Sequence, residues 1–471
     1  MQNQPTSAPH TEAPSGVAPS SAAPSTAAPT VAPVAQSDRI LLIDILRGVA
    51  LLGILLMNIP TFSMPDNFIE AFTQNPDSTN FWVFTGITVL FEGKMRALFS
   101  FVFGVGVLLF LAKKEQTNRS AVRLYYRRMG WLIVFGLVHA YLLLWFGDIL
   151  YGYGVCGLLL YLFRKVRPLY LALGVPLIAI VGFVGSTLFN QNIAQKHLAY
   201  LDAIRAQQTG VVLTASQTQA LADWRELEKT MLPNQEDAAR NTALMKGSYS
   251  SVAKRVRPLS FLFQTTYLPF LLPDVLALML LGMALYKWGF LSGAWPTRRY
   301  RLTMLVGYGL GLPLVCFSVY YALQHTPTRE AALAYNDTHP ISWVSLIYPV
   351  QRILLVLAHS SAIILIVRAG LLKGLTRRLA AVGQMAFTNY IMHTLVCTLF
   401  FYGYGLNYFA ELQYYQLFYL VGVIWIVQLY LSPLWLKYFR FGPLEWLWRS
   451  LTYWKWQPMQ RNAPVPALPA V

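Results

Sequence analysis

The chain has 471 residues, of which 56% are hydrophobic and only 12% are charged. Soluble globular proteins carry about 25% charged residues, so this composition excludes an ordinary cytosolic enzyme, a coiled coil and a disordered chain. The formal charge of +17 comes from 37 Lys and Arg against 20 Asp and Glu. Because most basic residues lie in short segments between apolar runs, the charge indicates orientation in a membrane and argues against nucleic acid as a partner.

Both ends of the chain have low sequence complexity. Residues 1–38 are rich in Ala, Pro, Ser and Thr, and residues 457–471 resemble a shorter version of the same segment. Such segments have too little apolar surface to fold, and their prolines favour extended conformations. We therefore predict two disordered tails, of which the first is a cytoplasmic tail.

Ten apolar runs lie between these tails, in a predicted domain of residues 39–456. Each run has roughly the 20 residues that a helix needs to cross the hydrocarbon core of a bilayer. The sequence therefore predicts an all-α fold, a polytopic transmembrane helical bundle of about ten spans. The runs cover residues 40–59, 95–112, 129–146, 148–164, 168–189, 259–286, 302–322, 343–368, 380–402 and 414–436. In the sixth run, Pro269 and Pro273 predict a break.

The connections between the spans alternate in charge. Basic connections cover residues 113–128, 164–167, 287–301, 373–378 and 437–449, and connections poor in Lys and Arg cover residues 60–80, 323–342 and 403–413. Since Lys and Arg stay on the cytoplasmic side, both termini are predicted to be cytoplasmic, and the protein is predicted to lie in a bacterial inner membrane. The 190–257 connection falls on the outer side and is too long for this charge rule.

Two patterns that elsewhere mark binding sites do not mark them here. The three cysteines lie inside apolar runs without the spacing of metal ligands, so we predict no metal site. The glycines of residues 152–157 match a dinucleotide-binding pattern, but no strand precedes them. Close packing of helices explains these glycines better.

Polar residues inside predicted spans are candidate functional residues, because burying them in hydrocarbon is costly. In the first span, Asp44 and Arg47 form either a buried ion pair or an anion site for a phosphorylated ligand from the cytoplasm. Asn58 lies near the outer end of the same span, where capping of the helix is the structural alternative.

Charged residues also begin the second and fourth spans on the predicted outer side. Glu92, Lys94 and Arg96 are expected at the outer surface, where they can simply be solvated. A basic residue there departs from the orientation rule, so Arg96 is expected to have an acidic partner, and Asp148 is the candidate. Asp148 also suits the positive end of a helix dipole.

His139 lies in the third span, roughly 15 Å from its cytoplasmic end at a rise of ~1.5 Å per residue. A histidine at this depth needs a hydrogen-bond partner and can exchange a proton near neutral pH. A structural hydrogen bond and catalysis both remain open. His393 reaches a similar depth in the ninth span, so we hypothesise that both imidazoles line one polar cavity.

The later spans contain further buried polar residues. Arg352 lies roughly 14 Å inside the eighth span, where it needs a carboxylate or a water-filled cavity, and Asp274 follows Pro273 in the sixth. The ninth span carries Gln384 and Asn389. On this span we expect a polar stripe formed by Gln384, Thr388 and His393.

Six sequence blocks resemble the YeiB family of bacterial inner-membrane proteins, which contain a domain of unknown function numbered 418. They are Asp44-Ile45-Leu46-Arg47-Gly48 with Asn58, Lys94-Met95-Arg96-Ala97-Leu98-Phe99-Ser100, His139 with Phe146-Gly147-Asp148-Ile149-Leu150, Met279-Leu280-Leu281-Gly282-Met283, Gly383-Gln384-Met385-Ala386-Phe387-Thr388-Asn389-Tyr390, and Phe441-Gly442-Pro443-Leu444-Glu445-Trp446. The resemblance extends from residue 39 to residue 455. The first span is also similar to that of transmembrane acyltransferases, which include heparan-α-glucosaminide N-acetyltransferase.

This resemblance implies transfer of an acyl group from cytoplasmic acyl-CoA, in the simplest case acetyl-CoA, to an acceptor such as a sugar hydroxyl or amine. The heparan enzyme has an Asn at the position of Asn58 and uses a histidine in the following outer loop. The present chain has no histidine between Asn58 and His139. Either His139 or His393 is then the base.

The predicted roles divide the polar residues into three groups. His139, Asn58, Asp148 and His393 are predicted to be catalytic; Arg47 and Asp44 to bind acyl-CoA; and Arg96, Arg352, Asp274, Gln384 and Asn389 to bind the acceptor. Membrane lipids are expected partners, and a homodimer is left open. The alternative function is a transporter or exporter of a small metabolite or lipid-linked precursor, in which the same polar residues form a proton relay.

Overall fold

The computed structural model describes residues 36–65, 72, 75–115, 121–232 and 235–461, and the remaining residues are not described. Within these ranges the chain is helical and has no β-strand, apart from one isolated bridge between Phe439 and Gln460. The predicted all-α fold is therefore confirmed. Most of the predicted tails, residues 1–35 and 462–471, lie outside the described residues.

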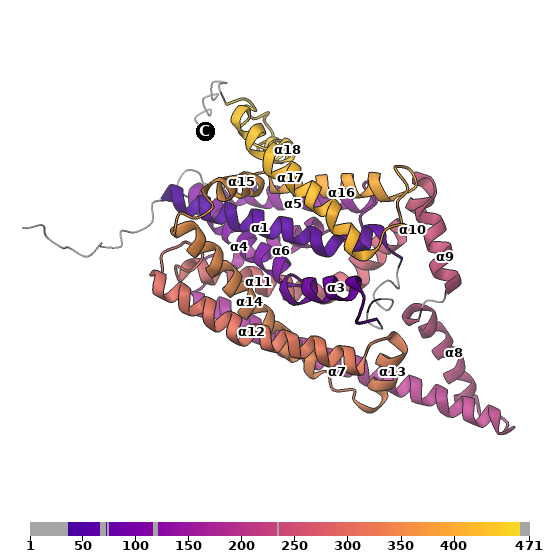
Figure 1. Ribbon diagram of the computed structural model, residues 1–471. Coiled ribbons are helices and arrows are strands. Elements are labelled where there is room, and N and C mark those ends of the chain that lie inside the picture. Colours follow the sequence, from indigo (N-terminus) through magenta and orange to yellow (C-terminus); the bar gives the residue numbers. More distant parts are fainter. Residues whose placement is uncertain (1–35, 66–71, 73–74, 116–120, 233–234, 462–471) are drawn as a thin grey trace, which may run out of the picture. The chain divides into compact units, whose positions relative to one another are not determined.

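Eighteen helical segments are described (Figure 1). They are α1 (Gln36–Ser63), α3 (Thr79–Leu90), α4 (Lys94–Glu115), α5 (Ala121–Tyr141), α6 (Leu150–Phe163), α7 (Pro168–Gln208), α8 (Ala215–Met231), α9 (Gln235–Met245), α10 (Tyr249–Leu262), η1 (Phe263–Tyr267), α11 (Leu268–Lys287), α12 (Thr297–His325), α13 (Arg329–Thr338), α14 (Trp343–Arg368), α15 (Lys373–Gln384), α16 (Ala386–Phe401), α17 (Tyr414–Tyr438) and α18 (Pro443–Tyr453).

Among the described residues, seven helical stretches are long and apolar enough to cross a membrane. They are Leu41–Ser63, Thr79–Ala112, Pro168–Gln208, Tyr249–Lys287, Thr297–His325, Trp343–Arg368 and Tyr414–Tyr438. The shorter apolar helices α6 and α16, together with α5, occupy the other predicted spans. The chain is thus a membrane protein built as a helical bundle, whereas the direction in which it crosses the membrane stays a prediction.

The second predicted span is longer than the sequence indicated. Helix α3 precedes α4, and only the short segment 91–93 separates them. Gly93 has φ +68°, a left-handed conformation that ends the helix and that side chains other than glycine rarely adopt. Lys94 is therefore only 1% exposed, so its expected position at the outer surface is wrong. The sequence analysis interpreted the polar residues around Gly93 as the outer end of a span, whereas they lie at a break inside it.

The ninth predicted span is also interrupted, because α15 ends at Gln384 and α16 begins at Ala386. Consequently Gln384 does not continue the helix that carries Thr388 and His393, and the expected polar stripe is wrong. In the sixth span the irregular turn is η1, just before Pro269, and α11 contains both prolines. The ring of Pro269 lacks the N–H that would bond to the carbonyl of Thr265, which favours a wider turn there.

Helix α1 lies at the centre of this packing, alongside α4, α15, α16 and α17 (Figure 1). Two glycines allow it to touch α15 at backbone distance. A Cβ atom on Gly383 would collide with the carbonyl of Asp44, and one on Gly48 would collide with the carbonyl of Leu379. The helix crossing therefore requires small residues, and it brings the polar start of α1 to the interruption between α15 and α16.

Candidate functional site

The end of α5 and the start of α6 form a buried histidine–aspartate pair. The Nδ1 atom of His139 lies 2.7 Å from Oδ1 of Asp148, and both side chains are buried. The Asp148 carboxylate also accepts hydrogen bonds from the backbone N–H groups of Leu150 (3.1 Å) and Tyr151 (2.8 Å). These bonds satisfy N–H groups at the start of α6 and hold the carboxylate in position against the imidazole.

The other face of the imidazole meets α16. Nε2 of His139 lies 2.8 Å from Oγ1 of Thr394, and the ring packs edge-on against Tyr390 with 5.1 Å between centroids. We call Asp148, His139 and Thr394 the His139 triad. Thr394 was missed by the sequence analysis, because a lone threonine in an apolar helix carries no local signal. A hydroxyl, an imidazole and an orienting carboxylate in this order form the arrangement that acid–base and nucleophilic catalysis use.

His393 lies beside Thr394 in the sequence but faces another helix. Its Nε2 lies 2.9 Å from Oε1 of Gln428 in α17, while Nδ1 has no hydrogen-bond partner among the described residues. Successive residues of a helix point about 100° apart, so the two imidazoles contact different neighbours. The two imidazoles therefore share no hydrogen-bond partner among the described residues, and one cavity lined by both stays a hypothesis. Nε2 of Gln428 donates in turn to the carbonyl of Asn389 at 3.0 Å.

A second charged group joins α4, α11 and α14. Arg352 donates from Nη1 to Oδ2 of Asp274 at 2.9 Å and from Nη2 to Oδ1 at 2.5 Å. Arg96 approaches the same carboxylate at 3.4 Å. Arg96 is thus paired with Asp274. The prediction that Asp148 is its partner is wrong, because the Asp148 carboxylate pairs with His139. We call Arg96, Asp274 and Arg352 the Asp274 cluster.

The Asp274 cluster adjoins the interruption between α3 and α4. Tyr348, one turn before Arg352, donates to the carboxylate of Glu92 at 3.0 Å. Lys94 donates to the carbonyl of Thr88 at 2.8 Å, and the Nε2 atom of His359 lies 3.0 Å from the carbonyl of Leu90. These side chains satisfy the last carbonyls of α3, which the interrupted helix leaves without backbone partners.

The interruption between α15 and α16 is satisfied in the same way. Arg47 pairs with Asp44 at 2.7 Å and also approaches the carbonyl of Gly383 at 3.3 Å. Asn389 donates to the carbonyl of Val382 at 3.2 Å, and to Ser432 at 3.1 Å. Arg47 and Asn389 therefore serve the last carbonyls of α15. The side chain of Gln384 lies within hydrogen-bonding reach of Asp44.

Helix α18 supplies the complementary acceptor for the start of α16. Oε1 of Glu445 accepts from the N–H groups of Phe387 (2.7 Å) and Thr388 (3.1 Å), and Oε2 accepts from the Thr388 hydroxyl (2.6 Å). A carboxylate at a helix N-terminus is favoured by the helix dipole. Sequence analysis did not assign this residue, because nothing local connects Glu445 to a helix that begins nearly sixty residues earlier.

Two further arginines lie near this interruption. The guanidinium of Arg128 stacks on Trp448 at 3.6 Å and lies within electrostatic range of Arg47, Arg449 and Glu445. In the described part of the chain, neither Arg128 nor Arg449 forms a salt bridge. Burial lowers the pKa of Arg449, because the guanidinium loses contact with water. We call Arg47, Arg128 and Arg449 the arginine cluster.

Asn58 is half-buried in α1, which continues past Pro60 to Ser63. Asn58 therefore does not cap the helix, so the structural alternative of a helix cap is wrong. Its side-chain amide forms no hydrogen bond with any described residue. A donor that is free and partly shielded from water is suited to binding a ligand oxygen.

Known proteins resemble the chain over both halves. Residues 39–208 match the family described as heparan-alpha-glucosaminide N-acetyltransferase, catalytic, and residues 285–455 match the family described as protein of unknown function (DUF418). Uncharacterized protein YxaH of Bacillus subtilis strain 168 is 28% identical over 450 residues, which cover 92% of this chain and 99% of YxaH. Uncharacterized protein YeiB of Escherichia coli strain K12 is 29% identical over 439 residues, which cover 88% and 96%. The chain is therefore similar to YeiB and YxaH over most of its length, and to the DUF418 family over residues 285–455.

No solved structure matches the chain. The two matched regions divide its polar residues. The region similar to the heparan enzyme includes Arg47, Asn58, Arg96, His139 and Asp148, and the DUF418 region includes Arg352, Gln384, Asn389, His393 and Thr394. The His139 triad therefore combines residues from both regions. Among the described residues no group of three His, Cys, Asp or Glu side chains is arranged to hold a metal ion.

Proposed function

We propose that the protein is a transmembrane acyltransferase of the bacterial inner membrane. It moves an acyl group, acetyl in the simplest case, from cytoplasmic acyl-CoA to a periplasmic or membrane-associated acceptor such as a sugar hydroxyl or amine. One observation carries the proposal. The region that matches the catalytic region of the heparan N-acetyltransferase contains His139 and Asp148, whose side chains are 2.7 Å apart.

In this proposal His139 is the general base. The Asp148 carboxylate accepts a hydrogen bond from the N–H group at Nδ1, which leaves Nε2 as the basic nitrogen, facing Thr394. The acceptor hydroxyl or amine either takes the place of the Thr394 hydroxyl or passes its proton through it. Since His139 and Thr394 are both buried, acceptor access requires α16 to shift, and the interruption at Met385 is suited to such a hinge.

The acyl transfer then proceeds through a tetrahedral intermediate. The acceptor oxygen or nitrogen attacks the thioester carbonyl carbon while its proton moves to Nε2 of His139. The amide of Asn58 donates a hydrogen bond to the oxyanion, a contribution of roughly 3 kcal/mol. The carbon–sulfur bond breaks, and the CoA thiolate leaves with the proton from His139. Asp148 stabilises the transient imidazolium.

The arginine cluster is the proposed site for the CoA phosphates, with Arg47 and Asp44 as the sequence analysis expected. Arg128 and Arg449 add two guanidinium groups without carboxylate partners. Phosphates bind such groups through charge-assisted hydrogen bonds. Gln384 lies beside Asp44 and is placed to contact the same ligand.

The Asp274 cluster is the proposed site for the acceptor. Arg352 is only 2% exposed, whereas the side chain of Asp274 is 28% exposed and that of Arg96 is 32% exposed. The cluster carries one net positive charge, and its two more exposed members are available for hydrogen bonds to a sugar. Asn389 and His393 bond to neighbouring helices, so their proposed contribution is to position α16 rather than to contact the acceptor.

Arg128→Gln and Arg449→Gln should each raise the KM for acetyl-CoA about tenfold with little change in kcat. Loss of one charged hydrogen bond to a phosphate costs about 1.5–3 kcal/mol, and a tenfold change corresponds to about 1.4 kcal/mol. Steady-state kinetics at constant ionic strength measure this. Arg301→Gln, at an exposed position of α12, is the matched control. An unchanged KM for acetyl-CoA in both Arg128→Gln and Arg449→Gln would refute the proposed phosphate site.

The proposed reaction is tested by incubating the purified protein in lipid nanodiscs with acetyl-CoA. We expect saturable binding of acetyl-CoA and slow release of free CoA, which a thiol reagent detects, even before the acceptor is known. Absence of both binding and CoA release would refute the acyltransferase assignment. A parallel assay follows the uptake of candidate metabolites into vesicles without CoA.

A transporter is the second candidate, favoured by the interrupted helices. The sequence analysis found a break only in the sixth span, whereas α3–α4 and α15–α16 are also interrupted. Transporters often bind substrates at such interruptions, where the backbone groups are free to contact a ligand. Here, however, side chains such as Lys94, Arg47 and Glu445 already occupy those backbone groups. Accumulation in vesicles without CoA would favour the transporter.

A further inference from the structure

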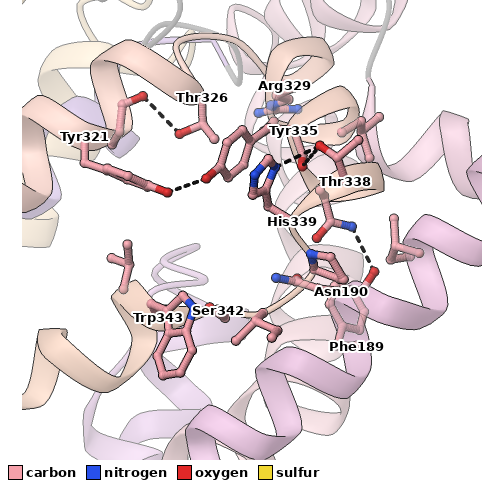
Figure 2. Close-up of a pocket in the computed structure, with 18 of the residues that line it drawn as sticks. Phe189, Asn190, Tyr321, Thr326, Arg329, Tyr335, Thr338, His339, Ser342 and Trp343 are labelled. Carbon is pink, nitrogen blue, oxygen red and sulfur yellow. Dashed lines mark hydrogen bonds between the residues drawn. The ribbon is translucent and has the colours of Figure 1, made fainter.

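A cavity of about 870 Å³, shown in Figure 2, is lined by none of the residues of the His139 triad. Its walls come from the middle of α7, the end of α12, six residues of α13 and the start of α14, and no residue of α5, α6 or α16 lines it. Its volume is near the upper end of the range of about 300–1,000 Å³ that small-molecule sites occupy. None of the residues assigned to the acyltransferase belongs to this cavity.

The cavity lies where its helices leave the membrane. Asn190 is 22 residues beyond Pro168 at the start of α7, which corresponds to about 33 Å of helix and to the thickness of the hydrocarbon core. Trp343 begins α14 and is 60% exposed, and Phe189 is 61% exposed. Aromatic residues at this depth are typical of the membrane interface. The cavity therefore adjoins the lipid on its apolar side.

The other side of the cavity offers neutral hydrogen-bonding groups. Figure 2 shows Asn190, Ser342 and His339 around its open centre. The side chains of Asn190 and Ser342 form no hydrogen bond with described residues. His339 stacks on Tyr335 with 4.5 Å between centroids, and its Nδ1 lies 2.8 Å from the Thr338 hydroxyl, which leaves Nε2 available.

Side chains of α13 bond to both of the long helices beside it, α7 and α12. Asn336 donates from its amide to the backbone carbonyl of Asn190 at 2.8 Å, and Asp337 pairs with His197 of α7 at 2.7 Å. The hydroxyl of Tyr335 also bonds to that of Tyr321 in α12. These contacts join α13 to both neighbouring helices, so the cavity is largely pre-formed.

We propose that this cavity binds a glycolipid-like amphiphile, with a hydrocarbon chain against Phe189 and Trp343 and an uncharged, hydroxyl-rich head against Asn190, Ser342 and His339. The apolar wall excludes a fully polar ligand. Among the described residues that line the cavity there is no carboxylate, so the quaternary ammonium of a phosphocholine head has no counter-charge there. The lining cation, Arg329, already interacts within the chain, which disfavours an anionic head. Aromatic rings such as Tyr335 suit the C–H faces of sugars.

This site is tested with a dodecyl maltoside probe that carries a diazirine on its alkyl chain, added to the full-length protein in phosphatidylcholine nanodiscs. After irradiation, we expect mass spectrometry to locate the label on α7 near Phe189 and on the first turn of α14. Excess unlabelled dodecyl maltoside should abolish this labelling, whereas the same concentration of dodecylphosphocholine should not. Equal competition by both, or labelling spread evenly over the lipid-facing helices, would overturn the proposal.

Two variants with a matched control separate binding from folding. Asn190→Ala combined with Ser342→Ala should lower the labelling about tenfold, because two hydrogen bonds to the head are lost. Trp343→Ala should lower it severalfold, whereas Trp82→Ala, at an equally exposed tryptophan of α3 (64%), should leave it unchanged. Wild-type labelling in the double variant would refute the proposed head-group contacts. The labelling does not depend on CoA binding, so its failure would not refute the acyltransferase proposal, and failure of the acyltransferase proposal would not refute this site.

Discussion

His139→Gln should lower the rate of acyl transfer from acetyl-CoA by about 10³-fold, without comparable loss of acetyl-CoA binding. The substitution removes the basic Nε2 that faces Thr394, and general-base catalysis typically contributes 10²–10⁴-fold. Glutamine retains hydrogen-bonding groups at a fully buried position, which limits the damage to the fold. The measurement is the release of CoA in single turnovers, with the affinity for acetyl-CoA determined in parallel.

His393→Gln is the matched variant. It alters a second buried histidine of the bundle, but one that bonds to Gln428 of α17 and not to the His139 triad. We expect its rate to remain within about threefold of the unmodified protein, since glutamine can retain a hydrogen bond to Gln428. If His393→Gln abolishes transfer and His139→Gln does not, the base has been assigned to the wrong histidine.

Asp274→Asn should destabilise the fold by about 3–5 kcal/mol. The change leaves Arg352, which is 2% exposed, with a buried charge and no carboxylate. Breaking one side of a buried ion pair has this cost because the remaining charge stays away from water. Unfolding in mixed micelles with increasing sodium dodecyl sulfate measures the free energy. Asp237→Asn, whose partner Arg240 is 71% exposed, is the control and should cost under about 1 kcal/mol.

A double variant separates the ion pair from general damage to the packing. Asp274→Leu combined with Arg352→Met removes the carboxylate and the buried guanidinium and should recover much of the stability lost in Asp274→Asn, because the charge that then lacks a partner is that of Arg96, whose side chain is 32% exposed. We expect this variant to fold but to lose binding of the acceptor. If the double variant is less stable than Asp274→Asn, the hydrogen bonds of the Asp274 cluster matter more than its charge balance.

The sequence by itself determined the class of the protein and most of its spans. Runs of about twenty apolar residues dictate helices in a membrane, because each backbone polar group must be paired within the segment. The sequence analysis assigned Asp148 to Arg96, although His139, the residue that Asp148 contacts, is only nine positions away across a tight hairpin. Arg352 was recognised as needing a carboxylate, although its partner was not identified.

Tertiary structure decided where the spans are interrupted and which polar groups meet. The break before Lys94 is stabilised partly by His359, and the break at Met385 by Arg47 and Glu445, all of which lie far away in the sequence. Thr394 reaches His139 across 255 positions. A span pattern records only how apolar each segment is. The contacts between polar faces depend on how each helix is rotated and where it crosses its neighbours. An example is the crossing that Gly48 and Gly383 permit, and such crossings are properties of the packed bundle.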